Sequence, residues 1–204
     1  MSSSGNLIVL SAPSGSGKTS LANRLLAELS GVRFSVSYTT RPKRRGERNG
    51  VEYYFVSEAD FERMIHADAF LEYAHVYDNY YGTARDFVLK EMESGYDVLL
   101  DIDVQGAMKV KERLPEAVMV FVLPPSFDVL RQRLLHRGLD DPRVIEKRLK
   151  IAREEIRHYK DYEYVIINDD ISRAVEELRS IVLASRCKVE RRSLEARRIV
   201  ETFR

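Results

Sequence analysis

A run of four apolar residues at positions 7–10, Leu-Ile-Val-Leu, leads directly into a loop of Ser, Pro and Gly residues that ends in Lys18 and Thr19. The absence of polar alternation is typical of a strand buried on both faces of a parallel sheet. After Thr19, leucines and alanines recur at helical spacing and stop before Gly31, a common helix terminator. This strand, loop and helix therefore predict an α/β fold.

The loop has the composition of a phosphate-binding loop. It matches the pattern GxxxxGK followed by Ser or Thr, except that Ala12 stands where the first glycine is usual. Glycines let the backbone curl so that successive N–H groups face a phosphate, and the following helix adds the positive end of its dipole. A chance Gly/Ser turn would lack the flanking strand and helix. The residues predicted to bind a nucleoside triphosphate are Ala12, Pro13, Ser14, Gly15, Ser16, Gly17, Lys18 and Thr19.

The two ends of this loop predict different chemical roles. Lys18 supplies a positive charge for the phosphates, and Thr19 offers a hydroxyl to a Mg²⁺ ion that bridges two of them. Asp101 and Asp103 follow a second buried run at 98–100 and project to the same side of its carboxyl end. We interpret Asp101 as ordering Mg²⁺ through water and Asp103 as contacting the acceptor, with capping of the next helix as the alternative.

Further apolar runs at 118–123 and 164–167 alternate with helical patterns. They predict a central, mainly parallel sheet flanked by helices, with ligands beyond the carboxyl ends of its strands. Between the first helix and the 98–100 strand, the pattern predicts a basic loop at 34–49, strands at 53–56 and 70–76, and a helix capped by Ser57. Asp78, Asn79 and Gly82 predict a turn, and helical periodicity resumes at Thr83.

Bulk composition narrows the function. A chain of 204 residues that is 44% hydrophobic can bury one sizeable core. Its 33 Lys and Arg balance 32 Asp and Glu to a net charge of +1, so no overall field attracts nucleic acid. The single cysteine, Cys187, favours a reducing compartment, and residues 7–10 are too few for a signal sequence or membrane span. We expect a cytoplasmic protein without a membrane or nucleic-acid role.

Several motifs, in order along the chain, resemble those of the guanylate kinases, and most closely the bacterial ones. The resemblance covers residues from about 7 to about 185. The motifs are Ser-Ala-Pro-Ser-Gly-Ser-Gly-Lys at 11–18, Ser-Val-Ser-Tyr-Thr-Thr-Arg-Pro at 35–42, Gly46-Glu47, Asn49-Gly50, Tyr-Tyr-Phe-Val at 53–56, Phe-Leu-Glu-Tyr-Ala at 70–74, Asn-Tyr-Tyr-Gly-Thr at 79–83, Asp-Ile-Asp-Val-Gln-Gly at 101–106 and Asn-Asp-Asp at 168–170.

The resemblance implies a P-loop nucleoside monophosphate kinase fold, in which ATP phosphorylates GMP, and dGMP as well, with Mg²⁺ as cofactor. A kinase-like domain at 5–185 would be followed by a basic amphipathic helix at 186–204. Within the domain, the implied parts are a core at 5–34, 94–136 and 151–185, a GMP-binding insertion at 35–93 and a lid at 137–150. The chain would act as a monomer or a homo-oligomer. The final helix would pack on the core or on a second subunit, with an RNA-binding arm as a weaker alternative.

The same resemblance assigns the acceptor site. Ser37, Arg41, Arg44, Tyr53 and Tyr81 would hold the phosphate of GMP, and Glu72, Thr83 and Asp103 would surround its guanine. Arginine forks match phosphate oxygens. A carboxylate can accept the N1 and N2 donors of guanine, while a hydroxyl satisfies O6. Without the motif, the basic residues at 41–48 would predict a solvated or RNA-binding loop.

Arginines of the lid complete the implied machinery. Arg137 and Arg148 would bring positive charge to the transferring phosphoryl group, so that Lys18, Arg41, Arg137 and Arg148 form the catalytic set. Asn168 would lie near the adenine of ATP, with helix capping as an equal alternative. Two other functions stay open, namely a non-catalytic interaction module of the same fold and a kinase for another nucleoside monophosphate.

Overall fold

The structure, a computed structural model, describes residues 4–76, 78–136 and 142–203. Its centre is a parallel sheet with the strand order β2 (Val32–Phe34), β7 (Asp97–Asp101), β1 (Leu7–Ser11), β8 (Val118–Leu123) and β9 (Tyr164–Ile167). Ile8 of β1 lies in register with Leu99 of β7 and Val118 of β8. The apolar runs at 7–10, 98–100 and 118–123 are thus the inner strands of one sheet, as predicted, and the run at 164–167 is its edge strand β9.

Helices cover both faces of this sheet, because its strands are apolar on both sides. Ile8 and Leu10 pack with α1 (Lys18–Glu28) and α7 (Ile171–Arg186), while Leu7 and Val9 pack with α3 (Arg85–Glu93) and α4 (Val104–Arg113). Each such side chain that is fully buried stabilises the fold by about 1.5–3 kcal/mol relative to an exposed one. The sheet is therefore rigid, and its carboxyl edge carries the loops at fixed positions.

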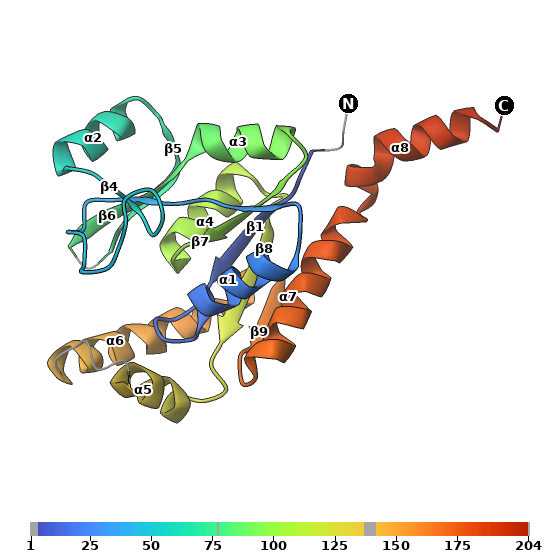
Figure 1. The fold of residues 1–204 in the computed structure, drawn as a ribbon. Coiled ribbons are helices and arrows are strands. Elements are labelled where there is room, and N and C mark those ends of the chain that lie inside the picture. The colour runs from blue at the N-terminus through green and yellow to red at the C-terminus, as the bar shows by residue number, and fades with distance from the viewer. Residues whose placement is uncertain (1–3, 77, 137–141, 204) are drawn as a thin grey trace.

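A second, smaller sheet projects from this core (Figure 1). Its order is β4 (Tyr54–Phe55), β3 (Tyr38–Thr39), β6 (Asn79–Ala84) and β5 (Phe70–Val76), and α2 (Glu58–His66) packs on it. The ring of Phe61 on α2 stacks on Phe70 at 4.5 Å and on Tyr80 at 5.3 Å between centroids. Ser57 caps α2 by accepting a hydrogen bond from the Asp60 amide, as the sequence predicted.

The prediction of a turn at residues 78–82 with a helix from Thr83 is wrong. Asn79–Ala84 forms β6, which pairs antiparallel with β5, and α3 begins only at Arg85. Asn and Gly are depleted in strands, yet here pairing and packing override the local preference. Tyr80 stacks on Phe61, and a side chain on Gly82 would collide with the ring of Phe70 at 2.9 Å.

The remaining helices lie between β8 and β9 in the chain and at its carboxyl terminus. Helices α5 (Phe127–His136) and α6 (Pro142–Glu155) pack through a small apolar cluster of their own, and the short 3₁₀ helix η1 (Ile156–Asp161) leads into β9. In the sequence, Asp141 followed by Pro142 predicts a helix that begins there, and α6 does begin at Pro142. Helix α8 (Val189–Glu201) follows α7 after a break at Cys187 and extends away from the core (Figure 1).

Candidate active site

The phosphate-binding loop joins β1 to α1 at the carboxyl edge of the parallel sheet. Gly17 caps α1 in the left-handed conformation, with φ of 88°. This conformation strains any residue with a side chain, and a Cβ atom there would also lie 2.4 Å from the Asn168 amide nitrogen. The loop folds back on itself through a hydrogen bond from the Ser16 amide to the Pro13 carbonyl, 3.1 Å. Its amides and the start of α1 can therefore receive an anion.

Lys18 and Thr19, the first residues of α1, both contact Asp101 at the end of β7. The Lys18 ammonium lies 2.7 Å from Asp101 Oδ1 and donates to the Ile102 carbonyl at 2.7 Å. Thr19 Oγ1 donates to Asp101 Oδ2 at 3.0 Å. An ammonium has three N–H donors, so these two contacts leave one for a phosphate oxygen.

The oxygens of Thr19 and Asp101, which lie 3.0 Å apart, are the kind of ligand that Mg²⁺ prefers. Among the residues that the structure describes, no three His, Cys, Asp or Glu side chains gather as a metal cage. A Mg²⁺ ion that is bound mainly by substrate phosphates and water needs only one or two protein oxygens.

Glu72 and Thr83 meet at the other side of the site. They face one another across the β5–β6 pair, and Thr83 Oγ1 donates to Glu72 Oε1 at 2.6 Å. Glu72 is only 4% exposed, and Thr83 is fully buried. Burial raises the pKa of Glu72 to about 7, with a smaller rise from nearby Asp103 and an opposing effect of the Thr83 hydrogen bond. A buried carboxylate beside a hydroxyl is an acceptor and donor pair at fixed spacing.

Asp103, just before α4, and Gly106 on that helix lie close to the Glu72 carboxylate. Asp103 caps α4 by accepting a hydrogen bond from the Gly106 amide at 2.8 Å, so the alternative reading of Asp103 as a helix cap is confirmed. A Cβ atom on Gly106 would lie 2.5 Å from Glu72 Oε2. Only glycine lets α4 approach the carboxylate so closely. Sequence reasoning gave Gly106 no role, although it lies in the motif at 101–106.

Arg41 anchors a second group of side chains, between the basic loop and the small sheet. Its guanidinium contacts Glu47 Oε1 at 2.7 Å and lies 5.4 Å from the centre of the Tyr53 ring, which packs edge-on against Tyr81 at 5.8 Å. Burial raises the pKa of Tyr53 to about 12, so its hydroxyl stays protonated and can donate. The structure thus brings Arg41, Tyr53 and Tyr81 together.

Glu47 orders this basic loop, a role that sequence reasoning missed. Besides contacting Arg41, it accepts the Arg44 backbone N–H at 2.7 Å. The hydrogen bond from Arg41 is the largest cause that lowers the pKa of Glu47, and the charge of Arg44 contributes as well. The Arg44 side chain is exposed, and Ser37 is half-buried with its carbonyl accepting the Tyr54 N–H at 2.9 Å.

Asn168 is buried against the phosphate-binding loop. Its amide donates to the Ser16 carbonyl at 2.7 Å, and Arg133 donates to the Asn168 carbonyl at 2.9 Å. Asp170, not Asn168, caps α7, so the helix-capping alternative for Asn168 is wrong. Arg133 had not been singled out from the sequence, because nothing in its spacing predicted this contact. Asn168 and Arg133 therefore fix the position of Ser16 in the phosphate-binding loop.

The predicted lid falls partly within α6. Arg148 is half-buried on that helix, and Arg137 lies outside the described residues. Near the end of α6, Glu155 and Asp103 line one cavity of about 310 Å³. Burial raises the pKa of Glu155, while the charge of Lys18 and a hydrogen bond from the Ser14 backbone lower it. Sequence reasoning missed Glu155, which joins the lid to the phosphate-binding loop.

A phosphate-binding loop at the carboxyl edge of a parallel sheet, beside an inserted smaller sheet that carries a buried carboxylate, is the arrangement of the class of P-loop nucleoside monophosphate kinases. The family model for guanylate kinase matches residues 4–185. This match covers most of the chain, and the chain belongs to the guanylate kinase family.

Individual relatives support the same family assignment. A guanylate kinase of Neisseria meningitidis serogroup A is 55% identical over 92% of this chain and 91% of its own length, and one of Caldanaerobacter subterraneus subsp. tengcongensis is 51% identical with the same coverage. The crystal structure of guanylate kinase from Anaplasma phagocytophilum superposes with a TM-score of 0.79 at 37% identity, covering 93% of this chain and 90% of that one. The chain is therefore an enzyme, a phosphotransferase that passes a phosphoryl group from ATP to GMP.

Proposed function

We propose that the chain transfers the γ-phosphoryl group of ATP directly to the phosphate of GMP, with the guanine against Glu72 and Thr83 and the ATP phosphates in the loop at 12–19. The buried Glu72–Thr83 pair is the observation that carries this assignment. A single residue, Ile102, separates Asp101, beside the phosphate-binding loop, from Asp103, beside Glu72. This short link supports a single cleft that holds both substrates.

The charge pattern of the pocket supports guanine rather than adenine. An ionised Glu72 accepts the N–H groups at N1 and N2, and the single O–H of Thr83 turns from Glu72 to donate to O6 when guanine binds. Adenine presents an acceptor at N1 and a donor at N6. The Glu72 carboxylate would then face another acceptor, and the Thr83 O–H would face another donor. A buried site matched to one hydrogen-bonding pattern rejects the mismatched analogue by about four to five orders of magnitude.

For the acceptor phosphate we propose Ser37, Arg41, Arg44, Tyr53 and Tyr81. Arg41 is already oriented by Glu47, which lowers the cost of ordering its side chain when phosphate binds. None of these contacts, nor those to guanine, uses the ribose 2′-hydroxyl, so we expect dGMP to be accepted as well.

Transfer then needs positioning and charge neutralisation more than a covalent intermediate. Lys18 would hold the β and γ phosphates, while Arg41 directs the acceptor oxygen toward the γ phosphorus. Thr19, with Asp101 acting through water, would hold Mg²⁺, which would supply positive charge at the two terminal phosphates. Arg148 on α6, together with Arg137, would add positive charge from the lid, and Asn168 would position the loop under the adenosine.

The cellular location of the enzyme can be inferred from its substrates and its single thiol. In the part of the chain that the structure covers, no helix is long and apolar enough to cross a membrane. We infer a cytoplasmic location, where both nucleotides are available and the exposed thiol of Cys187 stays reduced.

A coupled assay of ADP formation tests the proposal, with ATP as donor and GMP, dGMP, AMP, UMP or CMP as acceptor. We expect turnover with GMP and dGMP at least about a thousandfold above AMP in kcat/KM. Absence of turnover with every acceptor would indicate a binding module instead. Preference for a pyrimidine or adenine monophosphate would exclude the guanine pocket described above.

A further inference from the structure

One residue of β5 has no counterpart on the strand that pairs with it. Phe70 lies opposite Ala84, and Glu72 lies opposite Thr83, so β5 advances by two residues where β6 advances by one. Leu71 is therefore the extra residue of a β-bulge. Bulges often lie beside active sites and re-aim a side chain, and this one directly precedes the Glu72 carboxylate.

The bulge turns two consecutive side chains toward α4. In a regular strand, neighbouring side chains point to opposite faces. Here Leu71 is buried in the apolar cluster to which α4 contributes, and the next residue, Glu72, brings its Oε2 within 2.5 Å of the place where a Cβ atom on Gly106 of α4 would lie. Regular pairing would put Leu71 opposite Thr83 and turn Glu72 to the other face. The position of the carboxylate therefore depends on the bulge.

Arg113 of α4 holds the bulge from the free edge of β5. This strand is the last of the smaller sheet, and α4 packs beside it (Figure 1). Nη1 of Arg113 donates to the carbonyls of Phe70 and Leu71, each at 2.9 Å. A bulge leaves its extra residue without a partner in the strand ladder. The charge-assisted hydrogen bonds from Arg113 thus stabilise the irregular part of the strand.

Lys109 makes a similar contact on the other side of Glu72. It lies one helical turn before Arg113, on the same face of α4. Its ammonium donates to the Tyr73 carbonyl and lies 4.8 Å from the centre of the Tyr73 ring. The two cations of α4 therefore bind the main-chain carbonyls of both neighbours of Glu72, Leu71 and Tyr73.

An ion pair does not account for the placement of Arg113. The nearest atoms of Arg113 and Asp68 lie 3.9 Å apart, and the two side chains are 50% and 67% exposed. Exposed pairs of this kind contribute about 0–1 kcal/mol. The two short bonds to the bulge carbonyls are the stronger interaction, because their donor is charged and their geometry is fixed by the strand.

We propose that Arg113 and Lys109 are positioning residues that fix the Glu72 carboxylate for guanine recognition and so strengthen the preference for GMP. The inference rests on the assignment of Glu72 to guanine made above. The contacts of both cations lie on β5 and at Asp68, away from the phosphate-binding loop. Their effect should therefore be confined to the acceptor.

Inosine monophosphate, IMP, separates this role from a purely structural one. Its base keeps the N1–H donor and the O6 acceptor of guanine but lacks the amino group at position 2. One of the two contacts with Glu72 is thus already absent. Displacement of the Glu72 carboxylate should cost GMP more than IMP.

Steady-state kinetics of Arg113→Met with both acceptors tests the proposal. We expect kcat/KM to fall at least about tenfold for GMP, mainly through KM, and at most about threefold for IMP, with KM for ATP within about twofold. Arg113→Lys, which keeps the charge and the N–H donors, should recover kcat/KM for GMP to within about threefold. Lys111→Met is the matched control, because Lys111 is a cation of the same helix that donates to the Asp161 carbonyl instead.

A double-mutant cycle shows whether Arg113 acts through Glu72. In a Glu72→Gln background, Arg113→Met should change kcat/KM for GMP by less than about twofold. A full loss in that background, or equal losses for GMP and IMP in the unmodified chain, would overturn the inference. If Arg113→Met does not fold, Lys109→Met carries the same comparison and should also lower the ratio of GMP to IMP.

The Glu72→Gln single variant separates this inference from the proposed function. If it leaves the ratio of kcat/KM for GMP and IMP unchanged, the guanine assignment of Glu72 fails, and the inference fails with it. If Glu72→Gln lowers the ratio but Arg113→Met does not, the inference alone is overturned.

Discussion

The hydroxyl of Thr83 donates to Oε1 of Glu72 at 2.6 Å, across two strands that meet in one hairpin. The register of β5 and β6 therefore sets the spacing between a carboxylate and a hydroxyl, independently of any ligand. Since Gly106 closes over the same carboxylate, burial raises the pKa of Glu72 to about 7.

Binding of GMP should weaken as the pH falls through 7. Protonated Glu72 can no longer accept both guanine N–H groups. Below the pKa, the ionised fraction of Glu72 falls about tenfold for each pH unit. We expect KM for GMP to rise about tenfold between pH 7.5 and pH 6, while KM for ATP changes little. Steady-state kinetics over this range provides the measurement. A flat profile for GMP would mean that guanine does not bind the carboxylate.

Replacing Glu72 with Gln should reduce GMP affinity and raise stability at alkaline pH. The folded-state pKa of Glu72 lies above its ordinary value of 4.5, so ionisation destabilises the fold progressively as the pH rises from about 4.5 through about 7. Glu72→Gln removes this penalty, which is on the order of 3 kcal/mol above pH 8 and absent below pH 4.5. Urea unfolding at pH 5 and pH 8.5 should show a gain confined to the higher pH. An equal effect at both values would exclude this cause.

Lys18→Ala should abolish turnover while leaving GMP binding largely intact. Lys18 contacts Asp101 and the Ile102 carbonyl, not the Glu72 pocket, and removal of one preorganised charge reduces kcat by about 10² to 10³ or more. Turnover and calorimetric GMP binding should be measured together. Arg24→Ala, an exposed change on the same helix, serves as the control. Retained turnover at saturating substrates would contradict the role of Lys18.

Gly106→Ala should displace the Glu72 carboxylate, which we propose binds guanine. The added methyl group would lie 2.5 Å from Glu72 Oε2 and 3.3 Å from Asp103 Oδ1, so α4 or the carboxylate must move. We expect KM for GMP to rise at least about tenfold and the free energy of unfolding to fall by about 1–3 kcal/mol. Glu112→Ala, on the exposed side of α4, should do neither. Unchanged GMP kinetics would show that α4 does not shape the pocket.

Asp97→Ala should destabilise the fold without slowing the reaction. Asp97 pairs with Arg186 and accepts two hydrogen bonds from Asn6 in a buried setting, and removing one partner of a buried pair costs about 3–5 kcal/mol. Asp169→Ala breaks an exposed pair with Arg173 and should have little effect. Denaturant unfolding compares the two. Equal stabilities would show that the Asp97 network contributes nothing.

Local patterns predicted the parts of the fold that depend on neighbours in the chain. The strand at residues 7–10, the phosphate-binding loop, the Ser57 cap and the helix starting at Pro142 are all present, because burial periodicity, caps and turn residues act within a few residues. The prediction of a turn at 78–82 and a helix from Thr83 is wrong because it also used only neighbours in the chain. Its Asn and Gly favour a turn locally, whereas pairing with β5 makes it a strand.

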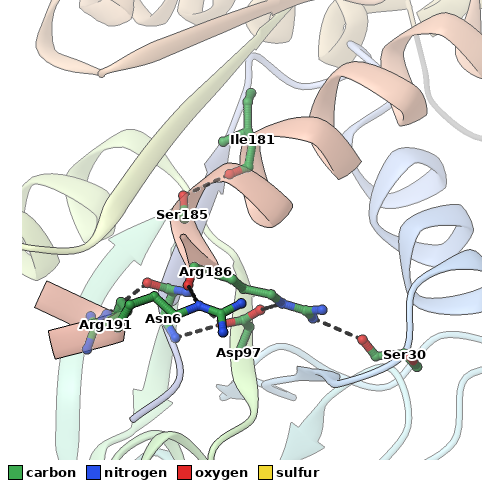
Figure 2. Close-up of polar contacts among 8 residues, drawn as sticks. Asn6, Ser30, Asp97, Ile181, Ser185, Arg186 and Arg191 are labelled. Carbon is green, nitrogen blue, oxygen red and sulfur yellow. Dashed lines mark hydrogen bonds and ion pairs between the residues drawn. The ribbon is translucent and has the colours of Figure 1, made fainter. Parts of the chain in front are cut away.

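The sequence alone determined the phosphate chemistry, because a loop that binds phosphate through its own amides needs no distant partner. Tertiary structure decided the rest of the site. Glu47 beside Arg41, Gly106 behind Glu72, Arg133 with Asn168 and Glu155 near Lys18 have roles that no local pattern reveals. The start of α8 is likewise fixed only by the folded core, where Arg191 donates to Asn6 and Asn6 donates to Asp97 (Figure 2). These contacts join residues far apart in the chain, and only the packed sheets and helices bring them within bonding distance.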